Sequence, residues 1–370
     1  MRRSLDLVEK MNEHRPKSDK HLTMATLLCL FFSLLGLVVM GAVKNCHPQC
    51  HCEVESFGLF DSFSLTKVDC RGIGPGNAPV PIPLDTSHLD LSLNSIISIS
   101  DSMLSGPGYT TLVSLDLSSN LIAHVSPKAF SKLRYLETLD LSSNALERLG
   151  DGCFTGLPLV ELDLSENRFK EFSLDLFTTR AQDIPIMVDL SQNLLTSITR
   201  KSPDHPLYIK SLMLAGNRLK TVPALNGVPL QYLNMDGNLI SSIDAGAFDS
   251  MTELVHLSLS GLSDLNLIQP GAFRGLRNLQ VLDLSNNSRL KTLSPDVFSG
   301  LVSLQELNLS NTAVTPLSRA VFTQMPSIKS ITLGPNVHCW KTHKQGQFHR
   351  QIGQAKPNDI LTCDNAGMIL

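Results

Sequence analysis

Cysteines are the residues of this chain best placed for covalent chemistry. Six of them lie in two groups, near the start and the end of the region after residue 45: Cys46, Cys50, Cys52, Cys70, Cys339 and Cys363. Grouped thiols form disulfides in an oxidising compartment, or they bind zinc. His47 and His51 lie among the first group, but the spacing does not suit the ligand pairs of a closed zinc site. We therefore expect two disulfides at the start, one at the end, and no metal or other cofactor.

Two further cysteines have no such neighbours. Cys29 lies in an apolar run near the start of the chain. Cys153 precedes Phe154 at a position where Ala129 precedes Phe130. No basic residue adjoins Cys153 to lower its pKa, so it is interpreted as a core residue and not as a reactive thiol.

Carboxylates form the second notable pattern. An aspartate occupies the middle of five successive L-x-L motifs: Asp90, Asp116, Asp140, Asp163 and Asp189. Stacked carboxylates could bind cations or a basic protein. The alternative is that Leu-Asp-Leu-Ser is a common choice in this kind of repeat, with the repulsion screened by salt. Where the acids stop, Met187, Met213, Tyr232 and His256 follow at neighbouring positions, and methionine and aromatic side chains are enriched at interface centres. The resulting hypothesis is a surface for a basic partner made of Asp116, Asp140, Asp163, Asp189, Met213, Tyr232 and His256.

Two other patterns concern extracellular chemistry. Asn286 and Asn308 begin N-x-S sequons and are candidate N-glycosylation sites. Between the last two cysteines lie Lys341, Lys344, Arg350 and Lys356. A short basic loop of this kind can bind heparan sulfate or another polyanion, or it is simply a solvated loop.

Catalytic motifs are not evident. The sequence has no phosphate-binding glycine loop before a helix, no G-x-S-x-G and no H-E-x-x-H. The aspartates are evenly repeated, unlike a catalytic pair in two different environments. With 31 Lys and Arg against 34 Asp and Glu, the chain also lacks basic character for nucleic acid. We expect a binding protein, neither an enzyme with a small-molecule substrate nor a nucleic-acid-binding protein.

The elements that position these residues are repeats. The pattern L-x-x-L-x-L-x-x-N recurs eleven times, with its last leucine slot every 21 to 26 residues from Leu91 to Leu333. This is the period of a leucine-rich repeat. It predicts an α/β solenoid, a horseshoe with a parallel β-sheet on the concave side, whose leucines stack into one core. Leu262 and Thr312 replace the asparagine, so irregular turns are expected there.

Further repeated residues fit the same solenoid. The asparagine amide can donate to and accept from backbone groups of the turn. The far side of each coil carries a phenylalanine, which predicts a packed spine rather than a ligand site: Phe130, Phe154, Phe177, Phe248, Phe273, Phe298 and Phe322. The residue between the two leucines of each strand faces the solvent.

The expected organisation has four parts. Residues 1–45 form a polar extension and a signal peptide with its core at 24–42. Alternatively, translation starts at Met24, or the apolar run is retained as a type II membrane anchor. Residues 46–84 form a cysteine-rich cap, 85–338 the eleven repeats, and 339–370 a C-terminal cap with one disulfide. Signal peptide and disulfides together predict a secreted protein of the extracellular space or matrix.

The N-terminal cap carries a family resemblance. The segments Cys46-His-Pro-Gln-Cys-His-Cys52 and Phe57-Gly-Leu-Phe-Asp-Ser-Phe-Ser-Leu-Thr66, with the repeats, resemble the extracellular small leucine-rich proteoglycan group. The resemblance covers residues 46–370 and implies the pairs Cys46–Cys52, Cys50–Cys70 and Cys339–Cys363. Two departures matter. The gap of 17 residues before Cys70 is longer than in most of the group, and no acidic Ser-Gly tract for a glycosaminoglycan chain follows the cap.

The members that this chain resembles most imply a secreted modulator of developmental signalling. Its expected partners are bone morphogenetic proteins and other TGF-β group ligands, or Wnt receptors of the Frizzled type. One alternative is a matrix protein that binds and organises collagen. Another is an adhesion receptor tethered by the N-terminal apolar run. The same arc could also pair two copies of the chain.

Overall fold

The computed structural model describes residues 46–57, 63–74, 80–177, 184–200, 207–314, 320–334, 337–343 and 359–363. The chain divides into two units, Met1–Val43 and Lys44–Leu370, and all described residues belong to the second. The expected signal-peptide core, 24–42, lies outside the described residues. Within the described ranges, no helix has the length and apolar character needed to cross a membrane.

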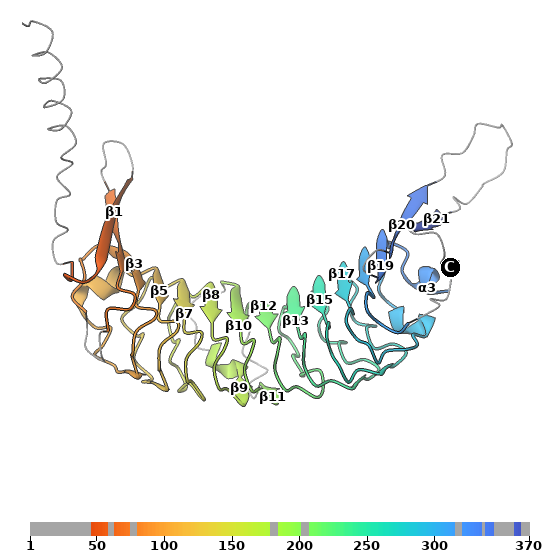
Figure 1. Cartoon of the computed structure of the whole chain (residues 1–370), viewed down its shortest axis with the longest axis horizontal. Helices are drawn as coiled ribbons and strands as arrows, with labels where there is room; N and C mark the ends of the chain where they lie inside the picture. The colour runs from red at the N-terminus through yellow and green to blue at the C-terminus, as the bar shows by residue number, and fades with distance from the viewer. Residues whose placement is uncertain are drawn as a thin grey trace, which may run out of the picture. The chain divides into compact units, whose positions relative to one another are not determined.

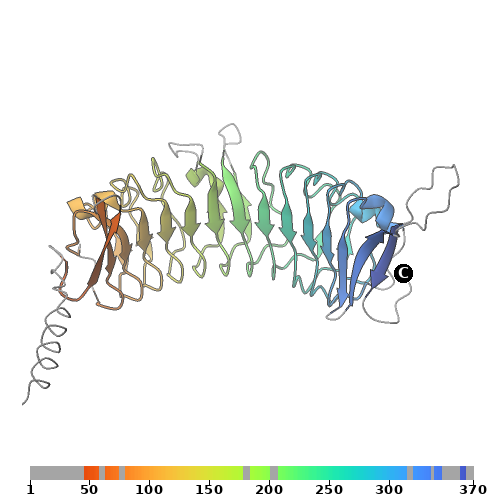
Figure 2. The same ribbon diagram turned by 90° about the horizontal axis from the view of Figure 1, so that it is seen from above.

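One long sheet runs through the second unit, and its strand order follows the chain order (Figures 1 and 2). Its strands are β1 (His51–Phe57), β2 (Phe63–Asp69), β3 (Thr86–Asp90), β5 (Ser114–Asp116), β7 (Thr138–Asp140), β8 (Glu161–Asp163), β10 (Ile186–Asp189), β12 (Ile209–Met213), β13 (Tyr232–Asn234), β15 (His256–Ser258), β17 (Val281–Asp283), β18 (Glu306–Asn308), β19 (Ser330–Gly334), β20 (Val337–His343) and β21 (Asp359–Cys363). Pairing is parallel from β2 to β19, and antiparallel between β1 and β2 and from β19 to β21. The predicted parallel sheet of a leucine-rich horseshoe is thereby confirmed, and it lines the inner side of the curve (Figure 1).

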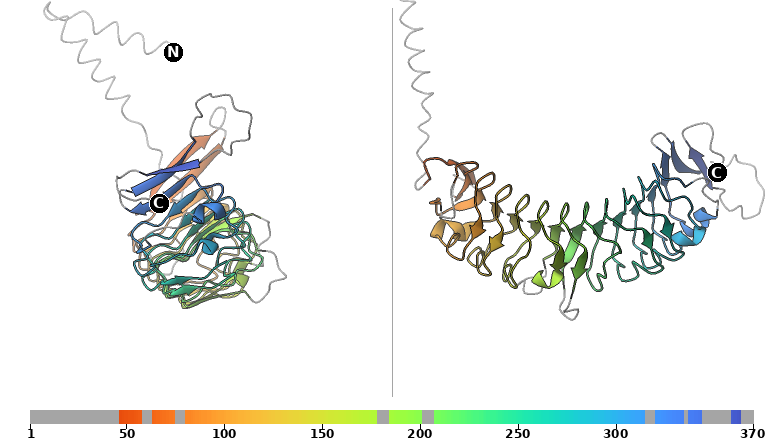
Figure 3. Two further views of the ribbon diagram at one scale, coloured as in Figure 1. Left: turned by 90° about the vertical axis from the view of Figure 1, so that its right-hand side faces the viewer. Right: turned by 60° about the horizontal axis from the view of Figure 1, so that its bottom comes forward.

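In the described ranges, the opposite side of the coils holds short elements, which Figure 3 shows below the sheet. Three two-stranded pairs lie there: β4 (Ser98–Ile99) with β6 (His124–Val125), β9 (Glu171–Ser173) with β11 (Ser197–Thr199), and β14 (Ser242–Ile243) with β16 (Leu267–Ile268). The helical turns are η1 (Pro107–Thr111), η2 (Leu174–Phe177), η3 (Pro295–Phe298) and α3 (Val321–Gln324). Each coil takes up more space along the stack on this side than at the strands of the long sheet. The stack therefore bends, with the long sheet on the inside of the curve.

The core is continuous along the stack. The two apolar residues of the L-x-L strands point into the core, as at Leu115 and Leu117, because alternate side chains of a strand point to one face. Leu333 in the last repeat is partly buried. The phenylalanine spine is present: Phe130, Phe154 and Phe177 stack with ring centroids 6.4 Å and 5.9 Å apart. Cys153 is buried within this core, and burial raises the pKa of its thiol to about 12. Such a thiol is inert, as expected from its sequence context.

A ladder of buried asparagines joins neighbouring coils. The Nδ2 atom of Asn193 donates to the carbonyls of Leu164, Leu190 and Ser191, at 3.0 to 3.1 Å, while Oδ1 accepts from the N–H of Phe169 at 3.2 Å. The amide thus satisfies backbone groups that no strand ladder reaches. Similar bonds recur at the buried asparagines of the other coils, for example Asn120 and Asn238.

The coils that lack this asparagine keep the left-handed residue of the regular turn. In the regular coils, the residue before the asparagine has a left-handed backbone, as at Ser119 with φ 54°. Gly261 and Asn311 hold the corresponding positions before Leu262 and Thr312, with φ 65° and 57°. Leu262 is fully buried, and its N–H donates to Oδ1 of Asn287 in the next coil at 2.7 Å. The expectation of an irregular or wider turn is confirmed at Leu262: the N–H of Leu265 donates back to the carbonyl of Leu262 at 2.9 Å, and the outer strand that follows begins one residue later than in the preceding coil.

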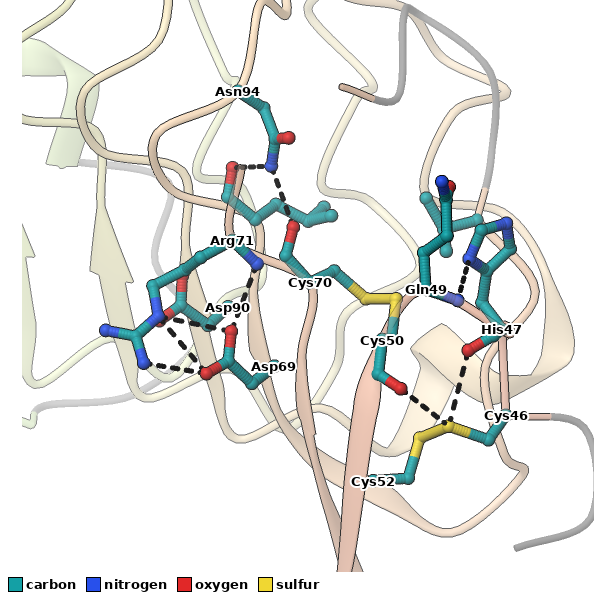
Figure 4. Close-up of a disulfide and its surroundings, with 12 residues drawn as sticks. Cys46, His47, Gln49, Cys50, Cys52, Asp69, Cys70, Arg71, Asp90 and Asn94 are labelled. Carbon is teal, nitrogen blue, oxygen red and sulfur yellow. Dashed lines mark hydrogen bonds and ion pairs between the residues drawn. A yellow bond between two sulfur atoms is a disulfide. The ribbon is translucent and has the colours of Figure 1, made fainter. Parts of the chain in front are cut away.

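The N-terminal cap contains two disulfides, Cys46–Cys52 and Cys50–Cys70 (Figure 4). Cys50 and Cys70 flank the hairpin of β1 and β2, so the second bridge joins these two strands at the end where Cys70 is fully buried in the leucine core. At the other end, Cys339 and Cys363 are Cα partners across β20 and β21. The third disulfide and the domain boundaries remain predictions.

Candidate ligand-binding surface

The concave sheet brings the predicted aspartates into one line. Asp116, Asp140, Asp163 and Asp189 are register partners across β5, β7, β8 and β10, and the line continues to Met213 on β12. We call these four carboxylates the acidic row. Neighbouring strands are about 4.8 Å apart, so the row extends over roughly 14 Å. Among the described residues, no ion pair involves any of the four.

Each carboxylate of the acidic row also stabilises the turn that follows its strand. One oxygen accepts the backbone N–H of the serine two residues on, as between Asp140 and Ser142 at 2.8 Å and between Asp189 and Ser191 at 2.7 Å. Sequence reasoning missed this role, although the recurring Asp-Leu-Ser was its signal. Burial raises the pKa of Asp140 and of Asp189 above the usual aspartate value, with hydrogen bonds from Ser142 and Ser191 acting in the opposite direction. A carboxylate without a compensating cation at such a site favours a cationic ligand.

The cap closes the N-terminal end of this line. Arg71 forms an ion pair with Asp69 at 2.7 Å and another with Asp90 at 3.3 Å (Figure 4). Asp69 and Asp90 are register partners on β2 and β3, so one guanidinium bridges two adjacent strands. Asp90 thus already has a cation, and the row available to a ligand begins at Asp116, the first carboxylate of the predicted surface.

Aromatic side chains occupy the next part of the face. Tyr232 on β13 and His256 on β15 are register partners whose rings stack with centroids 4.6 Å apart and an angle of 16°. Met213 lies beside them on β12, and Met187 on β10 is 40% exposed. All seven residues that were predicted to bind a partner lie on strands of the long sheet, the aspartates and Met213 in one row of register partners and Tyr232 and His256 in another. Burial lowers the pKa of His256, against the opposing effect of Asp283, Asp236 and Glu306.

The two sequons occupy different environments. Asn308 lies half-buried on the concave face, where its Oδ1 accepts from the hydroxyl of Ser310 at 2.8 Å and its Nδ2 donates to Asp283 at 3.2 Å. Asn286 is exposed in the turn after β17, and its Nδ2 donates to the hydroxyls of Ser260 and Ser285. A glycan on Asn308 would therefore stand on the same face as the acidic row. Glycosylation at either position remains a prediction.

The remaining candidate residues add no site to this face. Lys341 lies in β20, whereas Lys344, Arg350 and Lys356 fall outside the described residues, so polyanion binding stays a prediction. Over the described part of the chain, no three His, Cys, Asp or Glu side chains are grouped in a way that could hold a metal ion. A shallow apolar hollow lies beside the cap, lined by Val80, Ile82, Leu84, Pro107 and Tyr109, and it brings no pair of acid and base side chains together.

Known proteins agree with this architecture. The family model described as Leucine rich repeat matches residues 110–177, 209–265 and 261–314. Tsukushi from Danio rerio is 87% identical over 347 residues, covering 94% of this chain and all of that protein. The chain belongs to the Tsukushi family. Tsukushi from Gallus gallus is 56% identical over 91% of this chain and 92% of its own length, and Tsukushi from Homo sapiens is 52% identical over 89% and 95%.

A solved structure shares the fold. The structure of the Toll–Spatzle complex from Drosophila superimposes with a TM-score of 0.57 at 21% sequence identity. The match covers 67% of this Tsukushi-family chain but only 33% of the matched chain, and at that identity it bears on the fold alone. The cap and the repeats therefore identify a leucine-rich repeat protein of the Tsukushi family.

Proposed function

We propose that this Tsukushi-family protein is secreted and modulates developmental signalling by binding other extracellular proteins on its concave face. The proposed ligands are growth factors of the bone morphogenetic protein and TGF-β group, or Wnt receptors of the Frizzled type. Membership of the family supports a leucine-rich repeat scaffold, and the disulfides of the cap suit an oxidising compartment.

One observation carries the proposal. The acidic row lies without an ion-pair partner among the described residues and runs in register into Met213, beside the Tyr232–His256 stack. Charges at an interface mainly accelerate association and select the partner, whereas aromatic and methionine side chains form the buried centre. For a basic ligand that covers both parts, the acidic row would accelerate association and select the ligand, and Met213, Tyr232 and His256 would form the buried centre of the interface.

The test is direct binding of the purified protein to three immobilised candidates: a bone morphogenetic protein, a Frizzled ectodomain and fibrillar collagen. Each is measured at low and at physiological salt. The charge variant replaces Asp116, Asp140, Asp163 and Asp189 by Asn, which keeps the oxygen that accepts the serine N–H. The control Glu147→Gln changes an exposed carboxylate outside the sheet.

We expect salt-sensitive binding to the growth factor or the receptor, weakened in the charge variant and unchanged in the control. Binding to collagen alone would instead favour the matrix-organising alternative. Binding that ignores both salt and the four substitutions would remove the acidic row from the proposed contact surface.

A further inference from the structure

Carboxylates flank the aromatic part of the concave face on its C-terminal side as well. Asp283 lies on β17, Glu306 on β18, and Asp236 in the turn after β13. Glu306 is exposed, and within the described part of the chain none of the three forms an ion pair. Glu306 is in register with Val281 and through it with His256, and Asp283 is in register with Ser258 on the strand of His256, so both charges lie on the C-terminal side of the stacked rings.

Two of these charges are held in fixed positions by neutral donors. Asp236 accepts from the hydroxyl of Ser258 and from the N–H of Ser260, both at 2.7 Å. Asp283 accepts from the N–H of Ser285 at 2.7 Å and from Nδ2 of Asn308 at 3.2 Å. Neutral donors orient a carboxylate without cancelling its charge, so this flank stays negative and pre-organised.

Between the two acidic flanks lies an apolar patch. Its row of register partners runs from Met187 through Ser211, Tyr232 and His256 to Val281. Ser211, the register partner of Tyr232 on β12, has the shortest side chain of this row. The face of the Tyr232 ring that is turned towards β12 is therefore not covered by a long side chain at this position of β12. Exposed apolar side chains framed by charged groups are typical of the centre of a protein interface.

We propose that this surface binds a segment whose apolar side chain contacts Tyr232 and Met187 and whose basic side chains lie on both sides of it. The inference deepens the proposed function, because it specifies the partner chemistry for the same face. From Asp189 on β10 to Asp283 on β17 there are four strand spacings, or about 19 Å. An extended partner would span this distance with about six residues, which sets the separation of its two basic groups.

Charge also decides which occupant fits. A second copy of this face would oppose carboxylates with carboxylates on both flanks, and like charges brought together disfavour association. Pairing of two copies through this surface is therefore not the occupant that we propose. A basic–apolar–basic segment of another protein satisfies both flanks and the centre at once.

Labelled synthetic peptides test this specification directly. The first probe carries Leu-Phe at its centre and two arginines on each side, about six residues apart. The second carries all its arginines on one side of the same centre. Fluorescence anisotropy with the purified protein at low salt should give a Kd about tenfold lower for the first probe, as two additional exposed charge contacts would produce.

Variants then separate the flanks from the centre. Asp283→Asn with Glu306→Gln should raise the Kd of the first probe to that of the second, and Tyr232→Leu should weaken both probes by a similar factor. The matched control Glu147→Gln with Glu253→Gln removes two exposed carboxylates outside the sheet and should change neither value. Circular dichroism of each variant checks that the fold is retained.

Equal affinity for the two probes, no binding of either probe, or no effect of the Asp283 and Glu306 substitutions would overturn the inference. The proposed function fails separately, if none of its protein candidates binds while the first peptide does.

Discussion

The Nε atom of Arg71 lies 3.3 Å from Oδ2 of Asp90, so the cap supplies a cation to a carboxylate of the first repeat. The same guanidinium contacts both oxygens of Asp69. Because Asp69 and Asp90 continue the line of the acidic row, the cap sets where negative charge begins on the concave face. The cap is thus part of the electrostatics of the surface as well as a cover for the core.

Removal of that cation should extend the acidic surface. Arg71→Gln leaves Asp69 and Asp90 without a countercharge, and we expect a basic ligand to bind several-fold more tightly at low salt. The hydrogen bond and charge of Arg71 lower the pKa of Asp69, so this pKa should rise in the variant. Carboxyl chemical shifts followed by NMR against pH measure it. A pKa of Asp69 that does not move would show that the ion pair is not formed in solution.

Asp140 should respond differently to two substitutions. Asp140→Ala removes the acceptor of the Ser142 N–H and should lower the free energy of unfolding by about 1 kcal/mol. Asp140→Asn keeps the acceptor and removes a charge that burial disfavours, so it should leave stability at pH 7 unchanged or higher. Thermal unfolding of both variants compares these effects, and an equal loss in both would contradict the proposed turn contact.

The pH dependence of Asp140 has a defined sign. Its pKa is raised in the folded state, so its stabilising contribution is present below the unfolded value of 3.8 and is lost as the pH rises through the folded pKa. The advantage of Asp140→Asn over the wild type should therefore exist at pH 7 and disappear below pH 3.8. Urea unfolding across this range tests the sign, and an advantage that grows on acidification would refute it.

The asparagine ladder should be a major source of stability. Asn193→Ala leaves the carbonyls and the N–H that Asn193 contacts in two neighbouring coils without their partner, at a cost of about 3 kcal/mol. The control is Asn278→Ala, since Asn278 is exposed and contacts only the carbonyl of Thr252. Urea unfolding should separate the two variants clearly. A similar small loss in both would mean that water replaces the amide of Asn193 without penalty.

The cap disulfides should differ in their importance. Replacing both Cys50 and Cys70 by Ser opens a loop of 20 residues at the first leucine layer, at a cost of about 3 kcal/mol in the chain-entropy model. The pair Cys46 and Cys52 closes only six residues, so its removal should cost less, about 2 kcal/mol. Yield in the medium and the melting temperature measure both double variants. A reversed order would show that loop closure is not the dominant effect.

Much of this fold was predictable, because the sequence of each repeat specifies its own strand, turn and core residues. The leucine spacing predicted the sheet, and Phe130 and Phe154 predicted the spine. The asparagines predicted bonds to backbone groups of the turn, but not that these bonds join neighbouring coils. The order of the acidic row and its continuation to Met213 followed from the register alone. Local periodicity is sufficient here since each coil packs mainly against its immediate neighbours.

The contacts that the sequence did not predict depend on another coil or on the cap. The pairing of Asp90 with Arg71 requires the cap strand to lie beside the first repeat in parallel register, which no repeat pattern encodes. The bond from the N–H of Leu262 to Oδ1 of Asn287 depends on the following coil. The negative flank at Asp283 was overlooked because the aspartates are interrupted there by Asn234 and Ser258, although the sheet places all of them in one line.

The agreement between strand order and chain order has a mechanical consequence. The bonds between parallel strands run along the stack of coils, in the direction in which the two ends of the solenoid would be pulled apart. Tension would break the hydrogen bonds of one strand pair at a time, and coils would detach one after another from an end. The Cys50–Cys70 bridge joins β1 to β2, so detachment of strands from the N-terminal side must begin between β2 and β3. Under tension, such a solenoid would therefore lengthen coil by coil.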